Sequence, residues 1–474
     1  MKQQLYTPPP VDIGSLFSIF KDKYAGYRIV SMPPGWREKE ESDFTFVLFN
    51  EEPDEQELRD FFRIATEHQL PNPRPISRKM LELSSLFHPL FFERFLEEVR
   101  YHPLDAAYTG FIQSLKTYHA ILPVNSGSSV GTNRYYLQSL LFLAGCTLSA
   151  AIIQNRFTEA TIQSKLDRLW QVSFYLESLE IDIISKEALQ QFVLQYGYAT
   201  DIPAFDRISA IKQMYGRLLT ALSKGVTTTP LLVKESRLTS AQQERFGFAP
   251  YLRNLLSDNL LAIFVYGSSV TSQHFADYDV ILYVKDTGSA LLALSGKNPS
   301  YNGVDINISV YDEEDFYGFQ SLSGDNLDQH VLCLYGEAVI PVKPPHELLY
   351  RNFSFGYVRM RQLLGMAGFL AKEGTHSGLE GKANLYQYFI KIPMHIAKGM
   401  RAAMQDPNSK ELINQWTKST LDYAVEEQIT LCESGQPWQA ISNAYAATLK
   451  LLYVLNDTYH AFVYVSPEVP EFLR

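Results

Sequence analysis

The chain has 474 residues, a net charge of −10 at pH 7 and 46% hydrophobic residues. This length exceeds one ordinary hydrophobic core, so we expect two or three domains. The negative charge argues against a broad nucleic-acid-binding surface, which needs clustered lysines and arginines. It is compatible with a nucleotide in a local pocket, because a bound Mg²⁺ can reverse the sign of the local field.

The cysteines and the apolar segments indicate a reducing, cytoplasmic setting without a membrane partner. Cys146, Cys333 and Cys432 lie far apart, with neither metal-ligand spacing nor a disulfide pattern. Residues 1–10 lack the apolar core of a signal peptide. The most apolar run, residues 135–153, contains several polar side chains and is interpreted as a buried core helix, since a membrane span needs about 20 mostly apolar residues.

Residues 1–225 are predicted to form a mainly helical region of unknown role, with a small β element near its start. Two strands are expected on either side of a Pro-Pro-Gly turn. Apolar residues then recur at helical spacing in four segments. The strands are predicted at residues 27–31 and 44–49, and the helices at 55–68, 77–101, 158–180 and 204–222. No internal repeat of fixed period is found.

A Gly- and Ser-rich segment, residues 123–134, lies between two helical stretches of this region. It is either a phosphate-binding loop that opens the next helix or a flexible connection with a helix cap. It has neither the Lys-Ser/Thr pair nor the preceding strand of a P-loop, so the second interpretation is favoured.

The second half begins after residues 225–230, which are interpreted as a linker or an extended edge segment. We expect a mixed-sheet domain over residues 240–345 and a helical bundle over 346–474, so the fold class is α+β. A helix is expected first, and four strands and a fifth short one follow. The helix is predicted at 240–259 and the strands at 261–266, 280–284, 304–310, 330–335 and 337–341.

Further helices are predicted between and after these strands. Asp312 is a plausible N-cap for one of them. They are expected at residues 312–320, 346–372, 384–405, 410–433 and 438–463.

Three acids and a glycine turn carry the chemistry that the sequence suggests. The strand at 261–266 runs into Gly267 and Ser268, and the next strand begins with Asp277 and Asp279. Residues i and i+2 of a strand share a face, so these two carboxylates point the same way. Asp305, in an alternating strand pattern, could join them from a neighbouring strand. Carboxylates so placed could hold Mg²⁺ and the phosphates that it carries, although each acid could also be a solvated surface residue.

This order of Gly-Ser, Asp-x-Asp and a later strand acid resembles the nucleotidyltransferase superfamily with the DNA polymerase β-like fold. The small bacterial and aminoglycoside nucleotidyltransferases, which append a helical bundle, are the most similar. The resemblance covers residues 240–465. It implies that Gly267 and Ser268 form the phosphate-side turn, that Asp277 and Asp279 bind the metal ion, and that Asp305 is the third catalytic and metal-binding carboxylate. The connection of eight residues before Asp277 is shorter than in those enzymes and lacks their usual glycine.

The implied reaction is the transfer of a nucleoside monophosphate from an NTP, in the first place ATP, to a hydroxyl acceptor, with release of pyrophosphate. Mg²⁺ is the expected cofactor, with Mn²⁺ as an alternative. Ser269 could contact a phosphate or simply cap a helix, and Lys391 could reach the triphosphate or be a solvated lysine. Two other functions stay open: a nucleotide-sensing or scaffold protein of the same fold, and a toxin–antitoxin type module.

Overall fold

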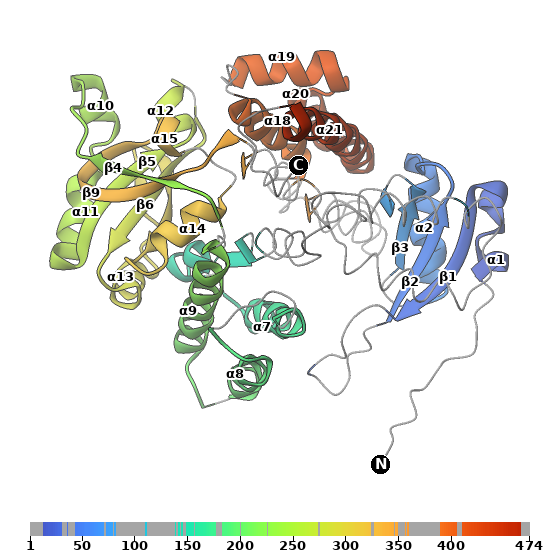
Figure 1. Cartoon of the computed structure of the whole chain (residues 1–474), viewed down its shortest axis with the longest axis horizontal. Coiled ribbons are helices and arrows are strands. Elements are labelled where there is room, and N and C mark those ends of the chain that lie inside the picture. Colours follow the sequence, from blue (N-terminus) through green and yellow to red (C-terminus); the bar gives the residue numbers. More distant parts are fainter. Residues whose placement is uncertain are drawn as a thin grey trace.

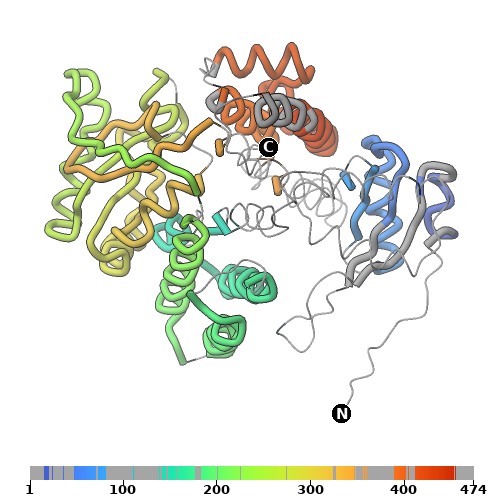
Figure 2. The backbone as a smooth tube through the Cα atoms, in the orientation of Figure 1, coloured from blue at the N-terminus to red at the C-terminus, as the bar shows by residue number. Residues whose placement is uncertain are grey.

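The fold is described from a computed structural model of the whole chain (Figure 1; Figure 2). The structure describes residues 13–30, 36, 43–70, 73–78, 80–81, 110, 138, 141–142, 144–145, 148–155, 157–176, 183–199, 201–224, 226–273, 275–323, 327–345, 347–348, 356, 358–359, 389–404 and 410–465. The Gly- and Ser-rich segment at 123–134 and most of the helices predicted at 77–101 and 346–372 lie outside these residues.

A three-stranded sheet with one helix forms the first part of the chain. Its strands are ordered β1-β2-β3, with β1 antiparallel to β2 and β2 parallel to β3. The elements are α1 (Ile13–Leu16), η1 (Ser18–Lys23), β1 (Tyr24–Val30), β2 (Asp43–Phe49), α2 (Glu55–Glu67) and β3 (Pro73–Ser77). The sequence predicted β1, β2 and α2, but it did not predict β3.

Helix α2 begins where its sequence predicts a start. The Asp54 carboxylate accepts from the backbone N–H of Glu57, and the Glu57 carboxylate accepts from the N–H of Asp54, which together form a capping box. The apolar side of the helix is buried against the sheet. This side is formed by Leu58, Phe61, Phe62, Ile64 and Ala65.

Helices α7 (Glu159–Ser173), α8 (Lys186–Tyr198) and α9 (Ala204–Ser223) follow in the N-terminal half. Arg207 on α9 links all three, because its guanidinium binds both Glu159 carboxylate oxygens at 2.9 Å and donates to the Tyr196 carbonyl at 2.8 Å. A buried bidentate arginine of this kind fixes the relative position of the helices. The sequence predicted α7 and α9 and missed α8.

A six-stranded mixed sheet, ordered β4-β9-β5-β6-β8-β7, forms the middle of the chain. Only β6 and β8 are parallel neighbours, and α13 (Thr287–Leu294) connects them. The strands are β4 (Thr229–Lys234), β5 (Leu260–Tyr266), β6 (Asp277–Val284), β7 (Ser300–Tyr301), β8 (Val304–Tyr311) and β9 (Leu332–Val342). The structure confirms the α+β fold class that the sequence predicted, with a mixed sheet and helices.

Several boundaries differ from the prediction. The segment interpreted as a linker or an edge segment contributes the edge strand β4, and the two strands expected at 330–341 are the single strand β9. The helix expected at 240–259 is broken into α10 (Ser240–Arg245), α11 (Ala249–Leu256) and a 3-10 turn, η3 (Ser257–Asn259). Pro250 in the first turn of α11 explains the break, since proline begins a helix more readily than it continues one.

The helix predicted at 312–320 begins later than expected, as α14 (Phe316–Leu322). The carboxylate of Asp312 accepts from the backbone N–H groups of Glu314 and Asp315, so it closes the turn that precedes the helix. Helix α15 (Leu327–His330) follows.

The C-terminal helices are α18 (Ile392–Ala403), α19 (Lys410–Leu421), α20 (Val425–Glu433) and α21 (Pro437–Val465). The single helix predicted at 410–433 is two helices, because Asp422 adopts a positive φ of 55° that an α-helix cannot contain. Among the described residues, no helix has the length and apolar content required to cross a membrane.

Among the described residues, the two halves of the chain contact each other at several places, two of which are contacts between helices (Figure 1). Helix α9 packs on α14, where Lys212 Nζ lies 3.4 Å from Asp315 Oδ2. Helix α2 packs on α21, where the Tyr445 hydroxyl donates to Glu52 at 3.2 Å. In both contacts a helix of the N-terminal half packs on a helix of the second half.

Candidate active site

The predicted acids meet on one face of the central sheet. Strands β6 and β8 are parallel neighbours, and their register pairs Asp277 with Asp305 and Asp279 with Asn307. Paired residues of adjacent strands lie on the same face, about 4.8 Å apart. Burial alternates as this requires, since Tyr278 and Ile306 are buried on the opposite face while the four polar side chains stay accessible.

Gly267 brings the backbone of the preceding turn against the second acid. It follows β5 with φ of 76° and ψ of −152°, a conformation that is essentially restricted to glycine. A Cβ added at Gly267 would stand 2.6 Å from Asp279 Oδ2, closer than real Cβ contacts allow. The strand register agrees, because Tyr266 is paired with Asp279. The turn and the carboxylate are thus in contact.

The two serines after the glycine differ in position. Both belong to the single turn α12 (Ser268–Thr271), which packs against β5 and β6. Ser268 is partly exposed beside the acids. Ser269 is fully buried, and its hydroxyl donates to the Tyr266 carbonyl at 3.3 Å. The Ser269 hydroxyl is therefore bonded to the end of β5 and does not cap α12, whose N-cap is Gly267 without a side-chain cap bond. Ser268 is the accessible hydroxyl of the two.

Arg245 holds the same turn from outside and had no sequence motif to mark it. Its guanidinium donates to the carbonyl oxygens of Ser269 and Ser272, at 3.0 Å in each case, and lies 5.5 Å from the centre of the Phe275 ring. A charged donor that bridges both ends of a short turn restricts its motion. The connection between Gly267 and Asp277 is therefore fixed from α10.

Asn307 is a second residue that the sequence did not single out. Its amide Nδ2 donates to Asp279 Oδ1 at 3.3 Å across the strand pair. Its position two residues after Asp305 could have indicated it, because the two side chains must share a face. The amide orients one oxygen of Asp279 without adding a further negative charge.

Lys391 reaches this face from the helical tail. It is half-buried, and its carbonyl accepts from the N–H of His395, so it stands at the first turn of α18. The hydroxyl of buried Tyr423 donates at 2.5 Å to the carbonyl of Ile390, the residue before it. The structure therefore brings together the glycine turn, the three acids and the lysine, which come from well-separated parts of the sequence.

The pKa of Asp277 reflects the charges around it. Burial raises the pKa of Asp277 above its ordinary value, the positive charge of Lys391 opposes that rise, and the negative charge of Asp305 adds to it. A carboxylate whose ionised form is disfavoured by burial and by a second carboxylate gains from any additional cation. The site is therefore short of positive charge.

The three carboxylates are candidate ligands for a metal ion. Within the described ranges, no group of three or more His, Cys, Asp or Glu side chains is arranged to hold a metal ion as it stands. The donor chemistry nevertheless fits Mg²⁺, because Asp277, Asp279 and Asp305 offer hard oxygen ligands on one face and the local field favours a cation. These three residues would be its ligands.

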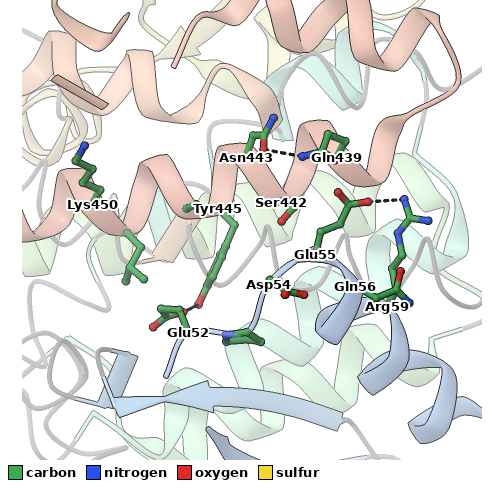
Figure 3. A pocket seen from close by; sticks show the side chains of 13 residues that line it. Glu52, Asp54, Glu55, Gln56, Arg59, Gln439, Ser442, Asn443, Tyr445 and Lys450 are labelled. Atoms are coloured by element: carbon green, nitrogen blue, oxygen red, sulfur yellow. Dashed lines mark hydrogen bonds and ion pairs between the residues drawn. The ribbon is translucent and has the colours of Figure 1, made fainter. Parts of the chain in front are cut away.

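A large cleft lies elsewhere in the part of the chain that the structure describes. It has a volume of about 950 Å³ and separates the start of α2 from the side of α21 (Figure 3). Glu52, Asp54 and Glu55 line one wall, and Asn443 and Lys450 line the other. None of the predicted site residues lines it.

Comparison with known proteins adds no relative. No protein-family model matches the chain, and neither a curated protein nor a solved structure matches it. A function for the chain must therefore be argued from the site itself.

Proposed function

We propose that the chain is a Mg²⁺-dependent nucleotidyltransferase that moves a nucleoside monophosphate from an NTP to a hydroxyl acceptor and releases pyrophosphate. The observation that carries this proposal is the pairing of Asp277 with Asp305 on parallel strands, together with the contact of Gly267 with the Asp279 carboxylate. Phosphoryl transfer depends on positioning and charge neutralisation, and this arrangement supplies the groups for both.

The proposed roles follow from the positions of the residues. Asp277 and Asp279 would hold Mg²⁺, which when bound neutralises charge on the triphosphate. Asp305, the exposed carboxylate beside them, is suited to orient the acceptor hydroxyl and to take up its proton. The backbone at Gly267 and the Ser268 hydroxyl would contact the phosphates, because no side chain blocks their approach.

Lys391 supplies a positive charge on the same side. Its effect on the pKa of Asp277 shows that it acts on the acidic face from the start of α18. A lysine so placed could bind the β- and γ-phosphates and compensate the three carboxylates. The helical tail would then contribute directly to nucleotide binding rather than only covering the domain.

A cytoplasmic setting belongs to the same proposal. The described cysteines, Cys333 and Cys432, are both free thiols, as is ordinary for a protein kept in a reducing compartment. The NTP and Mg²⁺ that the reaction needs are the expected partners.

Pyrophosphate release is the direct test. The full chain would be incubated with Mg²⁺, each of the four NTPs and a panel of acceptors comprising aminoglycoside-type sugars, protein hydroxyls and nucleotides. Asp279→Asn should abolish release, while Asp258→Asn, which changes an exposed acid before β5, should not. Release that is unchanged in Asp279→Asn would reject the metal assignment.

A nucleotide-sensing protein of the same fold is the second candidate. The buried Ser269, in a connection held by Arg245, favours it, because a rigid short turn limits how the triphosphate can bind. Equilibrium binding of a non-hydrolysable ATP analogue separates the two functions. Mg²⁺-dependent binding that Asp279→Asn removes, without pyrophosphate release for any acceptor, would establish sensing instead of transfer.

A further inference from the structure

The two sheets of the chain share one connectivity. In the N-terminal half, β1 is antiparallel to β2, α2 follows, and β3 is parallel to β2 in the order β1-β2-β3. In the second half, β5 is antiparallel to β6, α13 follows, and β8 is parallel to β6 in the order β5-β6-β8. Each set is an antiparallel strand pair followed by a strand–helix–strand crossover, which places the third strand beside the second.

The flanking elements match as well. A 3-10 turn leads directly into the first strand in both halves, η1 before β1 and η3 before β5. An aspartate caps the crossover helix in both: Asp54 accepts from the N–H of Glu57 at 2.9 Å, and Asp286 accepts from the N–H of Ser289 at 2.7 Å. The agreement thus extends beyond the order of the strands to the residues that start the helix.

The strands also match in sequence when they are aligned from their first residues. Strand β2 reads Asp-Phe-Thr-Phe-Val-Leu-Phe from Asp43, and β6 reads Asp-Tyr-Asp-Val-Ile-Leu-Tyr from Asp277. Both begin with an aspartate, continue with an aromatic residue and end in an apolar run. Asp43 thus corresponds to Asp277 and Thr45 to Asp279.

The spacing of later helices agrees too. In the first half β3 ends at Ser77 and α9 begins at Ala204. In the second half β8 ends at Tyr311 and α21 begins at Pro437, after nearly the same length of chain. Each of these two helices thus follows the last strand of its set at a similar distance along the chain.

We infer that the chain contains two copies of one unit, an N-terminal unit (residues 18–223) and a C-terminal unit (residues 257–465), and that the N-terminal unit is a non-catalytic partner of the other. The part of this inference that concerns catalysis rests on the proposed function.

The N-terminal unit lacks the groups that the site needs. Thr45 stands in place of the second metal-binding acid. Its strand partner Pro73 corresponds to Asn307. Arg28 pairs with Thr45 as Tyr266 pairs with Asp279, so Ile29 and Val30 replace the Gly-Ser turn. Asp43 alone is left of the Asp-x-Asp pair, and one carboxylate is too few for a metal site of this kind.

The N-terminal unit has instead a packing role, and the packing is reciprocal. Its helix α9 lies on the C-terminal core, where Lys212 faces Asp315 and the Thr220 hydroxyl donates to the Glu314 carbonyl at 3.1 Å. Its own core lies on the C-terminal helices, where Tyr445 donates to Glu52 and the Arg59 guanidinium lies 5.4 Å from the Trp438 ring centre. One helix of each unit thus contacts the other unit.

Mn²⁺ binding to the full chain tests the inference. Binding is measured as the loss of the electron paramagnetic resonance signal of free Mn²⁺. Asp279→Asn should remove the Mn²⁺ site, and Asp43→Asn should leave it unchanged. Thr45→Asp, which restores the Asp-x-Asp pair on β2, should add a further site, while the isosteric control Thr45→Asn should add none. Circular dichroism and thermal unfolding of each variant show that the fold is retained.

Two results would overturn the inference while leaving the proposed function in place. One is a wild-type Mn²⁺ site that Asp43→Asn removes or weakens as strongly as Asp279→Asn does. The other is a folded Thr45→Asp chain that binds no more Mn²⁺ than Thr45→Asn. A wild-type chain with no Mn²⁺ site sensitive to Asp279→Asn would reject both the inference and the proposed function. The N-terminal unit could not then have lost a metal site that the C-terminal unit has.

Discussion

The backbone of Gly267 lies against the carboxylate of Asp279, so that a Cβ on the glycine would stand 2.6 Å from Asp279 Oδ2. This contact joins the turn after β5 to the second acid of β6. It explains why the position requires a residue with no side chain, independently of the positive φ that the turn also demands.

Gly267→Ala is expected to lower the stability of the chain by about 1–3 kcal/mol from backbone strain and to abolish pyrophosphate release by displacing Asp279. Gly296→Ala is the matched control, because Gly296 also has a positive φ, of 72°, but has no atom within 4 Å of the added Cβ. The control should lose about 1–2 kcal/mol and keep its activity. Urea unfolding and pyrophosphate release measure both. Equal activity in the two variants would show that the contact with Asp279 has no functional role.

Lys391→Met should shift the acidic limb of the pH–activity profile to higher pH. Burial already raises the pKa of Asp277, and Lys391 is the charge that opposes this rise, so its removal raises the pKa further. Asp277 must then lose its proton at a higher pH before it can bind Mg²⁺. Lys398→Met, which changes an exposed lysine of the same helix, should leave the profile unchanged. An identical shift in both variants would refute a specific effect of Lys391.

Stability should respond to the same group with a definite sign. Because the folded-state pKa of Asp277 is raised, the folded chain retains this proton to higher pH than the unfolded chain does. The contribution of Asp277 therefore favours folding below the unfolded value near 3.8 and is lost as the pH rises through the folded pKa. Lys391→Met should extend this loss to higher pH, and denaturant unfolding across the acidic range would detect the extension.

Asn307→Ala is expected to reduce pyrophosphate release several-fold without a measurable loss of stability. The side chain is exposed, and changes at such sites usually alter stability by less than about 0.5 kcal/mol. The substitution removes the amide that donates to Asp279 Oδ1. Pyrophosphate release should therefore depend less strongly on the Mg²⁺ concentration than it does in the wild type. Ser309→Ala, two residues along the same strand face, serves as the comparison. A Mg²⁺ titration curve that superimposes on the wild-type curve would show that Asn307 has no positioning role.

Lys212→Met should destabilise the chain by about 3–5 kcal/mol at pH 8, because it leaves the buried Asp315 carboxylate without its partner. Burial raises the pKa of Asp315 to about 6 even with the lysine present. Below that pH the acid is neutral and needs the lysine less, so the destabilisation should shrink toward pH 5. Lys212→Met/Asp315→Asn should recover much of the stability. Urea unfolding at both pH values measures the destabilisation. A destabilisation of the same size at pH 8 and at pH 5 would contradict this account.

The central sheet could be predicted in large part because its strands carry local signals. Leu260–Tyr266 is a continuous apolar run, and Asp277 and Asp279 fall at strand spacing. Their pairing with Asp305 depends on a parallel register, which no local pattern determines. The resemblance to nucleotidyltransferases supplied the expectation that these residues meet, and the structure places them as neighbours.

The elements that were missed have physical reasons. Strand β3 contains Pro73 and Pro75, which normally argue against a strand. Helix α13 is apolar on most sides and contains Gly288, so it shows no amphipathic period. Strand β9 bends at Gly336, whose positive φ of 73° makes one strand look like two in the sequence.

The repeated unit escaped the sequence for a different reason. The two copies share the pattern of apolar residues and the aspartates that begin β2 and β6, but the identical positions between them are few. Functional residues, which usually make a repeat visible, are present in only one copy. Strand pairing and helix capping preserve the relationship after the side chains have changed.

The ion pair between Lys212 and Asp315 determines how the chain can be divided. A fragment that began after α9 would contain Asp315 in an apolar interior with its counter-charge on the missing piece, and it would expose the apolar surface of α14 that α9 now covers. Such a fragment would aggregate or require acidic buffer to stay folded. Dissection into separately expressed halves is therefore a poor route to this protein, and co-expression of both pieces is the alternative that preserves the pair.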